Sequence, residues 1–143
     1  MKYRQLWQLT PSGNTTTPYT VRNISKVVGV VGAQAITVGE DELGNTALYR
    51  MSHRGPYRYG LNGLEYLGKP IEDKTLGSNG GVSLNLAATN VVAHVRWFGD
   101  KRQVWFWFAT GSANDPNVLA VLTLGRQYGY SGGARLEKNE ETA

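Results

Sequence analysis

Cysteine is absent from this chain, and so are long runs of apolar residues. With no cysteine among 143 residues, disulfide bridges, thiolate zinc sites and cysteine nucleophiles are excluded. No stretch reaches the roughly 18 consecutive apolar residues of a membrane-spanning helix, and the first ten residues lack the apolar segment of a signal peptide. We therefore expect a protein without a membrane span that folds in a reducing cytoplasm and is held together by packing alone.

Charge is also scarce, and it is unevenly spread. Charged residues make up 18% of the chain, and the net charge is +4. Residues 1–135 contain 14 Lys or Arg against 8 Asp or Glu, whereas residues 136–143 contain one Lys and three Glu. A basic body attracts nucleic acid or acidic surfaces, but so small a charge is also ordinary for a soluble protein. The length predicts one domain over 1–135, followed by a flexible acidic tail over 136–143.

Glycine and proline, in contrast, are frequent. The 18 Gly and 5 Pro leave little room for helices of the usual length of about 11 residues. Apolar and polar residues alternate as they do in strands. Strands are expected at 4–10, 27–38, 46–51, 55–60, 64–67, 91–98, 104–109 and 118–124. The sequence thus predicts an all-β fold of antiparallel hairpins.

The expected strand over 104–109 (VWFWFA) has no polar face. Side chains alternate along a strand, so its two tryptophans would point one way and Val104 and its two phenylalanines the other. A nearly continuous apolar run is typical of a strand covered on both sides. We expect neighbouring sheets or another chain to cover both faces. The candidate buried seam or interface consists of Trp97, Trp105, Phe106, Trp107 and Phe108.

The chain also contains an internal repeat. Residues 47–68 and 103–125 share a plan: an aromatic-rich strand, a loop with glycine, a short apolar strand and a closing Leu-Gly pair. These Leu-Gly pairs, which begin at Leu67 and Leu124, lie 57 residues apart. The plan, extended to units of about 25–68 and 82–125, is typical of propeller blades, although WD40-type blades have about 40–45 residues. Since closed propellers need at least about four blades, the two units predict a partial or oligomer-completed propeller.

One loop of the first unit gathers basic and aromatic side chains. The candidate partner- or DNA-facing loop contains His53, Arg54, Tyr57 and Arg58. In a functional interpretation, arginines bind phosphates and tyrosine stacks on bases. In a structural one, the tyrosines cover a sheet edge and the arginines are solvated. The matching loop of the second unit, residues 111–117, has none of these groups.

Patterns for catalysis or cofactor binding are missing. The sequence has no P-loop, dinucleotide-binding glycine motif, nucleophile elbow or H-E-x-x-H motif. His94 has no second histidine or acid at metal-ligand spacing. The acidic run Glu40-Asp41-Glu42 lacks the alternating acids of a calcium loop and indicates a solvated turn. We expect neither enzymatic activity nor a cofactor or metal.

Two segments carry a resemblance to a known group of proteins. Residues 47–68 (ALYRMSHRGPYRYGLNGLEYLG) and 95–124 (VRWFGDKRQVWFWFATGSANDPNVLAVLTL) resemble propeller-like blade repeats of tailed-bacteriophage structural proteins, notably collar, nozzle and tail-hub components. The resemblance implies a non-catalytic virion protein of the tail, collar or nozzle, assembled in the host cytoplasm. Such a protein would build an oligomeric ring or bridge neighbouring virion proteins, with non-specific contact to packaged DNA as a further expectation.

Two other functions remain open from the residues themselves. A carbohydrate- or receptor-binding β module would leave two or more of the aromatic side chains exposed with polar groups beside them, and full burial would exclude it. A nucleic-acid-binding protein would use the basic loop, and its affinity would fall with salt. The three functions therefore predict different surfaces.

Overall fold

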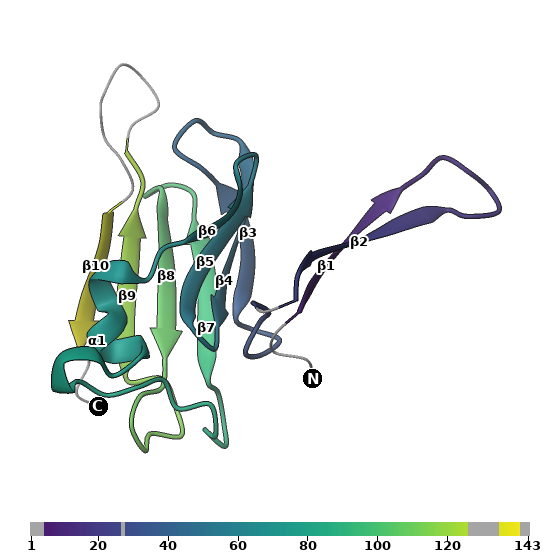
Figure 1. The fold of residues 1–143 in the computed structure, drawn as a ribbon. Helices are drawn as coiled ribbons and strands as arrows, with labels where there is room; N and C mark the ends of the chain where they lie inside the picture. Colours follow the sequence, from purple (N-terminus) through teal and green to yellow (C-terminus); the bar gives the residue numbers. More distant parts are fainter. Residues whose placement is uncertain (1–4, 27, 126–134, 141–143) are drawn as a thin grey trace.

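The computed structural model describes residues 5–26, 28–125 and 135–140. Within these residues, ten strands form three antiparallel sheets, accompanied by one short α-helix. Figure 1 shows two larger sheets beside each other and a hairpin that extends away from them. The predicted antiparallel β architecture is confirmed in the coarser form of a mostly β fold, and the described strands form no closed propeller.

The first large sheet is a four-stranded meander in which each strand pairs with the next. It consists of β3 (Ile36–Glu40), β4 (Thr46–Ser52), β5 (Gly55–Gly60) and β6 (Gly63–Tyr66). The tight turn between β5 and β6 contains Asn62-Gly63, and Gly63 has a φ of +82°. Gly60 pairs with Gly63, so Leu61 and Asn62 form the turn itself, and the positive φ at Gly63 suits glycine because it lacks a Cβ. Local turn chemistry thus sets the register of this hairpin.

The second large sheet repeats this meander. It consists of β7 (Ala93–Phe98), β8 (Gln103–Phe108), β9 (Val118–Thr123) and β10 (Arg135–Glu140). Residues 136–140, expected in a flexible tail, instead form most of β10 and pair with β9. The remainder of the expected tail, 141–143, lies outside the described residues.

The sequence repeat and the topological repeat coincide only in their first hairpins. The β3–β4 and β7–β8 hairpins occupy the same place in the two sheets. The closing Leu-Gly pair that begins at Leu67 follows β6, however, whereas the pair that begins at Leu124 follows β9. The second sheet therefore extends beyond the expected unit of 82–125 to include β10.

The expected strand over 27–38 begins only at Ile36. Its described earlier part bends, and the N–H of Ala35 donates to the carbonyl of Gly32 at 3.1 Å. This bent segment hydrogen-bonds to Met51 of β4 through Val31 and Ala35. The valines at 28 and 31 are nevertheless buried. The apolar run therefore predicted burial correctly, but its early part bends back onto β4 instead of extending as a strand.

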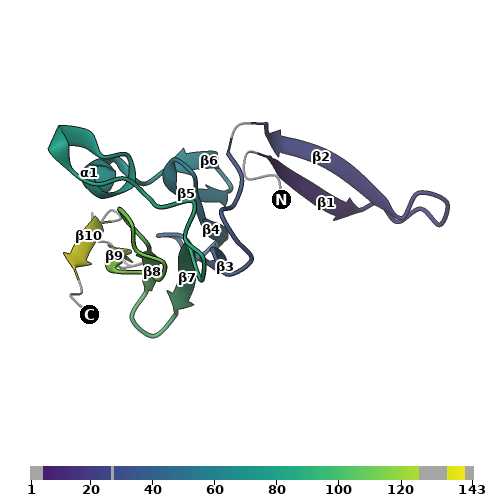
Figure 2. The ribbon, with the colours of Figure 1, turned by 90° about the horizontal axis from the view of Figure 1, so that it is seen from below.

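The two large sheets pack face to face around one core, as Figure 2 shows from below. Tyr49 of β4 and Phe106 of β8 are fully buried in it. Trp97 of β7 packs where the sheets meet, stacked on Tyr49 with ring centroids 6.3 Å apart. Its indole also lies against Gly39 of β3, where an added Cβ would be 2.7 Å from the ring. The missing side chain of Gly39 thus makes room for Trp97.

A two-stranded hairpin projects from the sandwich, and we call it the arm. It consists of β1 (Leu6–Pro11) and β2 (Tyr19–Ser25). A strand is expected at 4–10, but its return strand β2 is not, because that segment contains few apolar residues. The connecting turn has Gly13 at a φ of +73°, which suits glycine because it lacks a Cβ.

Short helical turns connect the two large sheets. They are η1 (Lys69–Ile71), α1 (Glu72–Thr75) and η2 (Ser78–Gly80). Ile71 is buried in the core, so the connection covers an open end of the sandwich (Figure 1). Across the described residues, every helix is too short and too polar to span a membrane.

Candidate functional site

The outer face of the second sheet bears large aromatic side chains. Strand alternation places three cross-strand pairs of β7 and β8 on this face: His94 with Trp107, Arg96 with Trp105, and Phe98 with Gln103. All six side chains are exposed or half-buried. The opposite face of β8 is buried in the core. The strand VWFWF therefore has one covered face and one that the described residues leave partly open.

The rings on this face touch one another in a continuous line, which we call the aromatic row. Ring centroids are 4.7 Å apart for Phe98 and Trp105, and 5.5 Å apart for Trp105 and Trp107. The imidazole of His94 lies 5.5 Å from Trp107 and ends the row. The planes are tilted or edge-on, which is the favoured arrangement for aromatic pairs. The row is therefore an ordered surface of rings.

Polar groups lie directly beside these rings. The Arg96 guanidinium is 5.4 Å from the Phe98 centroid, and the Lys101 ammonium is 5.3 Å from that of Trp105. The indole N–H of Trp105 donates to the Oε1 of Gln103 at 3.0 Å. Partly exposed rings flanked by polar groups are the surface that the carbohydrate-binding alternative requires.

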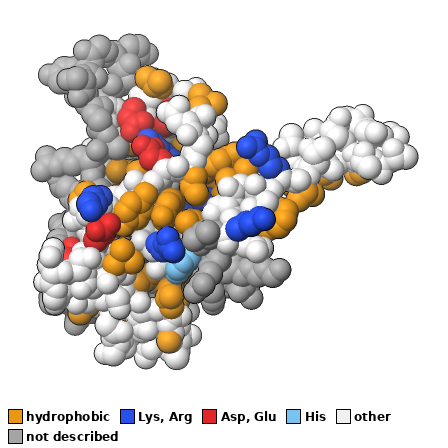
Figure 3. All heavy atoms as spheres, viewed as in Figure 1, with side chains coloured by type: hydrophobic (Ala, Val, Ile, Leu, Met, Phe, Trp, Pro, Cys, Tyr) orange, Lys and Arg blue, Asp and Glu red, His pale blue; other side chains and the backbone are white. Residues whose placement is uncertain are grey.

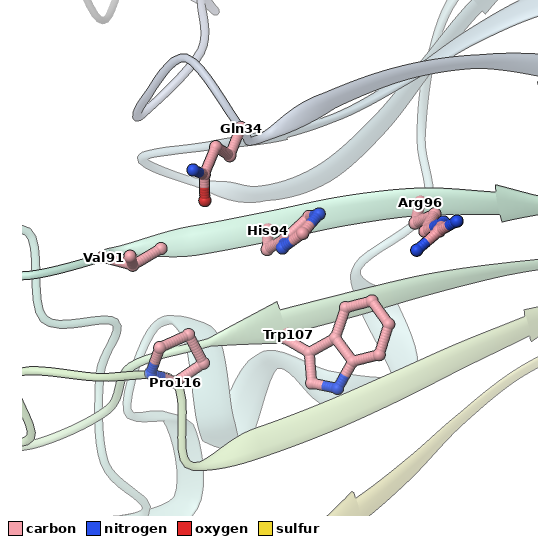
Figure 4. A pocket seen from close by; sticks show the side chains of 6 residues that line it. All are labelled: Gln34, Val91, His94, Arg96, Trp107 and Pro116. Atoms are coloured by element: carbon pink, nitrogen blue, oxygen red, sulfur yellow. The ribbon is translucent and has the colours of Figure 1, made fainter.

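A groove opens at the His94 end of the row and is shown in Figure 4. Its volume is about 350 Å³. It is lined by Gln34, Val91, His94, Arg96, Trp107 and Pro116. The lining combines an indole, an amide, an imidazole and a guanidinium, and it includes no carboxylate. Such a groove suits a small ligand with one apolar face and a negative charge.

The predicted buried seam is divided between the two faces of the second sheet. Phe106 and Phe108 are fully buried in the core, while Trp97 is half-buried where the sheets meet. Trp105 and Trp107 lie on the outer face and are half-buried. The five residues therefore form no common seam within the described chain, because consecutive residues of β8 point to opposite faces.

The predicted basic loop is also divided. Arg54 is exposed, and His53 and Tyr57 are half-buried, but Arg58 is buried. Arg58 donates from Nε to Glu65 at 2.8 Å and from Nη1 to both carboxylate oxygens of Glu42 at 3.0 Å. Its guanidinium is thus occupied by internal carboxylates, and the loop presents Arg54 as its one exposed arginine.

The pKa of Arg58 reflects these partners. Burial alone would lower the pKa, but hydrogen bonds with Tyr49, Glu65 and Glu42 outweigh burial and raise it above the ordinary value. A charged guanidinium that is held in this way stabilises the fold. Arg58 is therefore a structural residue that links β5 to β6 and to the β3–β4 turn.

The acidic run after β3 binds arginines, although the sequence indicates a solvated turn. Besides the Glu42–Arg58 pair, Arg102 of the β7–β8 turn lies 3.4 Å from Glu40 and donates to the carbonyl of Asp41 at 2.9 Å. These contacts join a turn of each large sheet. No group of three or more metal-ligating side chains is found in the part of the chain that the structure describes.

Arg50 is the most unusual residue that the sequence did not reveal. It lies on the face of β4 opposite the core side chain of Tyr49, across from Tyr57 and Ile36. It is 0% exposed, and none of its three guanidinium nitrogens has a hydrogen-bond partner among the described residues. Burial lowers the pKa of Arg50 to about 10. The sequence signal was an arginine within an otherwise apolar strand.

The arm has one apolar and one polar face. Its apolar face contains Trp7, Leu9, Pro11, Tyr19 and Val21, together with the polar Asn23 opposite Trp7, and its polar face contains Gln8, Thr10, Thr20 and Arg22. Leu9 and Val21 form a cross-strand pair and are 59% and 62% exposed. Figure 3 shows hydrophobic side chains along one side of the arm. The arm thus presents an apolar strip that the described residues leave uncovered.

No protein-family model, curated protein or solved structure matches this chain. The surfaces described above are therefore the basis of the functional proposals that follow.

Proposed function

We propose that this protein is a non-catalytic structural subunit that assembles with further copies of itself, and that the apolar face of the arm is a contact surface. The resemblance of residues 47–68 and 95–124 supports a place in the tail, collar or nozzle of a tailed bacteriophage, where the subunit builds a ring or bridges neighbouring virion proteins. The observation that carries the proposal is the exposed, one-sided apolar arm.

An isolated two-stranded hairpin is marginally stable in water. Full burial of a large apolar side chain is worth about 1.5–3 kcal/mol, and Trp7, Leu9, Tyr19 and Val21 are each more than half exposed. Arg22, the charged residue of the two arm strands, lies on the polar face. An identical apolar face therefore meets no like-charge repulsion, and a second copy of the chain is a suitable occupant.

The propeller interpretation belongs to the same proposal. Each large sheet is a four-stranded antiparallel meander, the connectivity of a propeller blade. A closed propeller has at least about four blades, so copies of the chain would supply the others. Association through the arm would bring such copies together.

Mass in solution tests the assembly proposal. The unmodified chain should form oligomers whose mass rises with concentration in light scattering or sedimentation velocity. Leu9→Asp places a charge on the apolar face and should shift the protein to monomer at the same concentration. Thr10→Asp is the matched control, because it adds the same charge at the next residue but on the polar face.

The control should retain the oligomeric mass. A chain that remains monomeric at every concentration, or two variants with equal effects, would contradict assembly through the apolar face of the arm. Circular dichroism of both variants verifies that the sheets still fold.

A second candidate, a carbohydrate- or receptor-binding module, is favoured by one specific observation. Trp105 and Trp107 are half-buried on an outer face, with Gln103 hydrogen-bonded to one ring and Lys101 over the same ring. This module is compatible with a virion subunit, since a binding face and an assembly arm lie on different parts of the chain (Figure 1).

A further inference from the structure

We propose that the groove at the His94 end of the aromatic row binds a pyranose sugar that carries a carboxylate, such as a uronic or sialic acid. The inference rests on the second candidate function and names its ligand class. It is independent of assembly through the arm.

Trp107 provides the apolar side of the groove. Its ring contacts Trp105 and His94, each at 5.5 Å between centroids, so neighbouring rings hold its orientation. The groove of about 350 Å³ lies near the lower end of the roughly 300–1,000 Å³ typical of small-ligand sites. An indole beside a space of this size suits one or two sugar rings, whose C–H groups pack on aromatic surfaces.

Charge determines which sugar fits. His94 and Arg96 are two residues apart on β7 and therefore share the outer face. Arginine binds carboxylates with paired, charge-assisted hydrogen bonds. None of the six lining residues is an acid, and the nearby Asp115 accepts a hydrogen bond from Asn90 at 3.0 Å. The groove thus offers a cation without a competing lining carboxylate.

Gln34 completes the lining from the opposite side. It lies in the segment before β3, whereas the other lining residues belong to the second sheet or its adjoining segments (Figure 4). Its amide both donates and accepts hydrogen bonds, as the hydroxyl groups of a sugar require. The groove therefore has separate partners for the ring, the hydroxyls and the carboxylate.

Binding of defined monosaccharides tests the proposal. Glucuronic acid and N-acetylneuraminic acid, with glucose as the neutral counterpart, are titrated into the full chain and followed by tryptophan fluorescence and ligand-observed NMR. Both acids should bind saturably, and glucose should bind at least about tenfold more weakly, because it lacks the charged hydrogen-bond acceptor.

Four variants locate the site. Trp107→Ala and Arg96→Gln should each weaken binding of the acidic sugars by about tenfold or more. Arg54→Gln removes an exposed positive charge and Leu61→Ala an exposed apolar side chain, both in turns of the first sheet, and neither residue lines the groove. Both controls should stay within about twofold of the unmodified chain. Arg96 is exposed, so its variant remains informative even if Trp107→Ala destabilises the fold.

The outcomes separate the ligand class from the broader function. Equal, Trp107-dependent binding of glucose and the acids would overturn the carboxylate assignment but retain a carbohydrate-binding module. No binding of any sugar, or tighter binding of inorganic phosphate or a nucleotide, would overturn both. Equal losses in all four variants would overturn the groove as the site. The oligomeric mass of the chain is measured separately and decides the arm proposal alone.

Discussion

The two large sheets have the same strand order and connectivity, yet their outer faces differ. Their inner faces are alike, since Tyr49 of the first sheet and Phe106 of the second are both buried in one hydrophobic core. On the outer side, the first sheet buries Arg50 without a hydrogen-bond partner in the part of the chain that the structure describes, whereas the second leaves Trp105 and Trp107 half-buried. The comparison shows that two sheets of the same topology can share an apolar inner face while their outer faces carry different side chains.

A similar contrast exists within the first sheet. Arg50 and Arg58 are both buried, on adjacent strands. Arg58 is held by two carboxylates, whereas no described residue forms a hydrogen bond with the Arg50 guanidinium. A buried arginine can thus be paired or unpaired. Removing the paired arginine should destabilise the fold, whereas replacing the unpaired one by an apolar side chain should not.

The largest expected effect compares the two faces of β8. Phe106→Ala should lower the free energy of unfolding by about 3–5 kcal/mol, because it opens a cavity in the core. Trp105→Ala, on the outer face of the same strand, should cost about 1 kcal/mol or less. Urea denaturation followed by circular dichroism measures both. Equal losses would mean that the outer face is packed as tightly as the core.

The next effect concerns the paired arginine. Arg58→Met should lower the free energy of unfolding by about 2–3 kcal/mol, because it leaves Glu42 and Glu65 without their cation. Arg54→Met, in the same loop but exposed, should stay within about 0.5 kcal/mol. If the two variants have the same free energy of unfolding in urea, the ion pairs of Arg58 do not stabilise the fold.

A smaller effect is expected where the sheets meet. Gly39→Ala places a Cβ 2.7 Å from the Trp97 ring, and overpacking of this kind should cost about 1–2 kcal/mol. Gly32→Ala is the control, because its Cβ would meet nothing within 4 Å. Thermal unfolding should place the Tm of Gly39→Ala clearly below that of Gly32→Ala, and the reverse order would contradict the packing of Trp97 on Gly39.

The smallest effect is expected at the unpaired arginine. Arg50→Met should leave the free energy of unfolding within about 1 kcal/mol of the original or raise it, because an apolar side chain removes a buried charge that has no partner. A loss of several kcal/mol would show that Arg50 makes a stabilising contact after all.

The difference in free energy of unfolding between Arg50→Met and the unmodified chain should depend on pH in a defined direction. Folding lowers the pKa of Arg50 from its ordinary value to about 10, so above pH 10 the unfolded chain binds more protons than the folded one. The cost of burying the charged Arg50 is therefore fully present below pH 10 and is relieved as the pH rises above 10. Any advantage of Arg50→Met should shrink from pH 8 to pH 11 in parallel denaturant titrations, and an advantage that grows would contradict the shift.

Much of the strand pattern was predictable because it depends on local residues. The Asn62-Gly63 turn and the alternation in GPYRYG predicted β5 and β6 close to their observed bounds. The alternation in VWFWF correctly separated Val104 and the phenylalanines from the two tryptophans. Alternation did not determine which of these two sets of side chains would face the core. We expected both faces of the strand to be covered, so the sequence did not distinguish the core face from the outer face.

Other elements were missed because their pairing is not local. β2 has few apolar residues and is a strand because β1 pairs with it. β10 contains several charged residues and pairs with β9 across the interval 126–134, which lies outside the described residues. Hydrogen bonding to a neighbouring strand outweighed weak intrinsic preference in both segments.

In the candidate sites, too, the sequence predicted local features and missed those that depend on contacts between distant segments. The sequence predicted that aromatic and basic residues gather in two places, but only the structure distinguished the exposed Arg96 from the internally paired Arg58. The groove brings Gln34 together with residues 91–116, a juxtaposition that no sequence spacing reveals. The burial of Arg50 likewise depends on what covers its face of β4.

The sequence by itself determined the class of fold, the positions of most strands and the alternation that divides each strand into two faces, because turn chemistry and side-chain direction act over a few residues. The tertiary structure decided which face became the core, which arginine found carboxylates and where the groove and the apolar arm lie. Those outcomes depend on contacts between segments far apart in the chain, where packing and desolvation outweigh local preference.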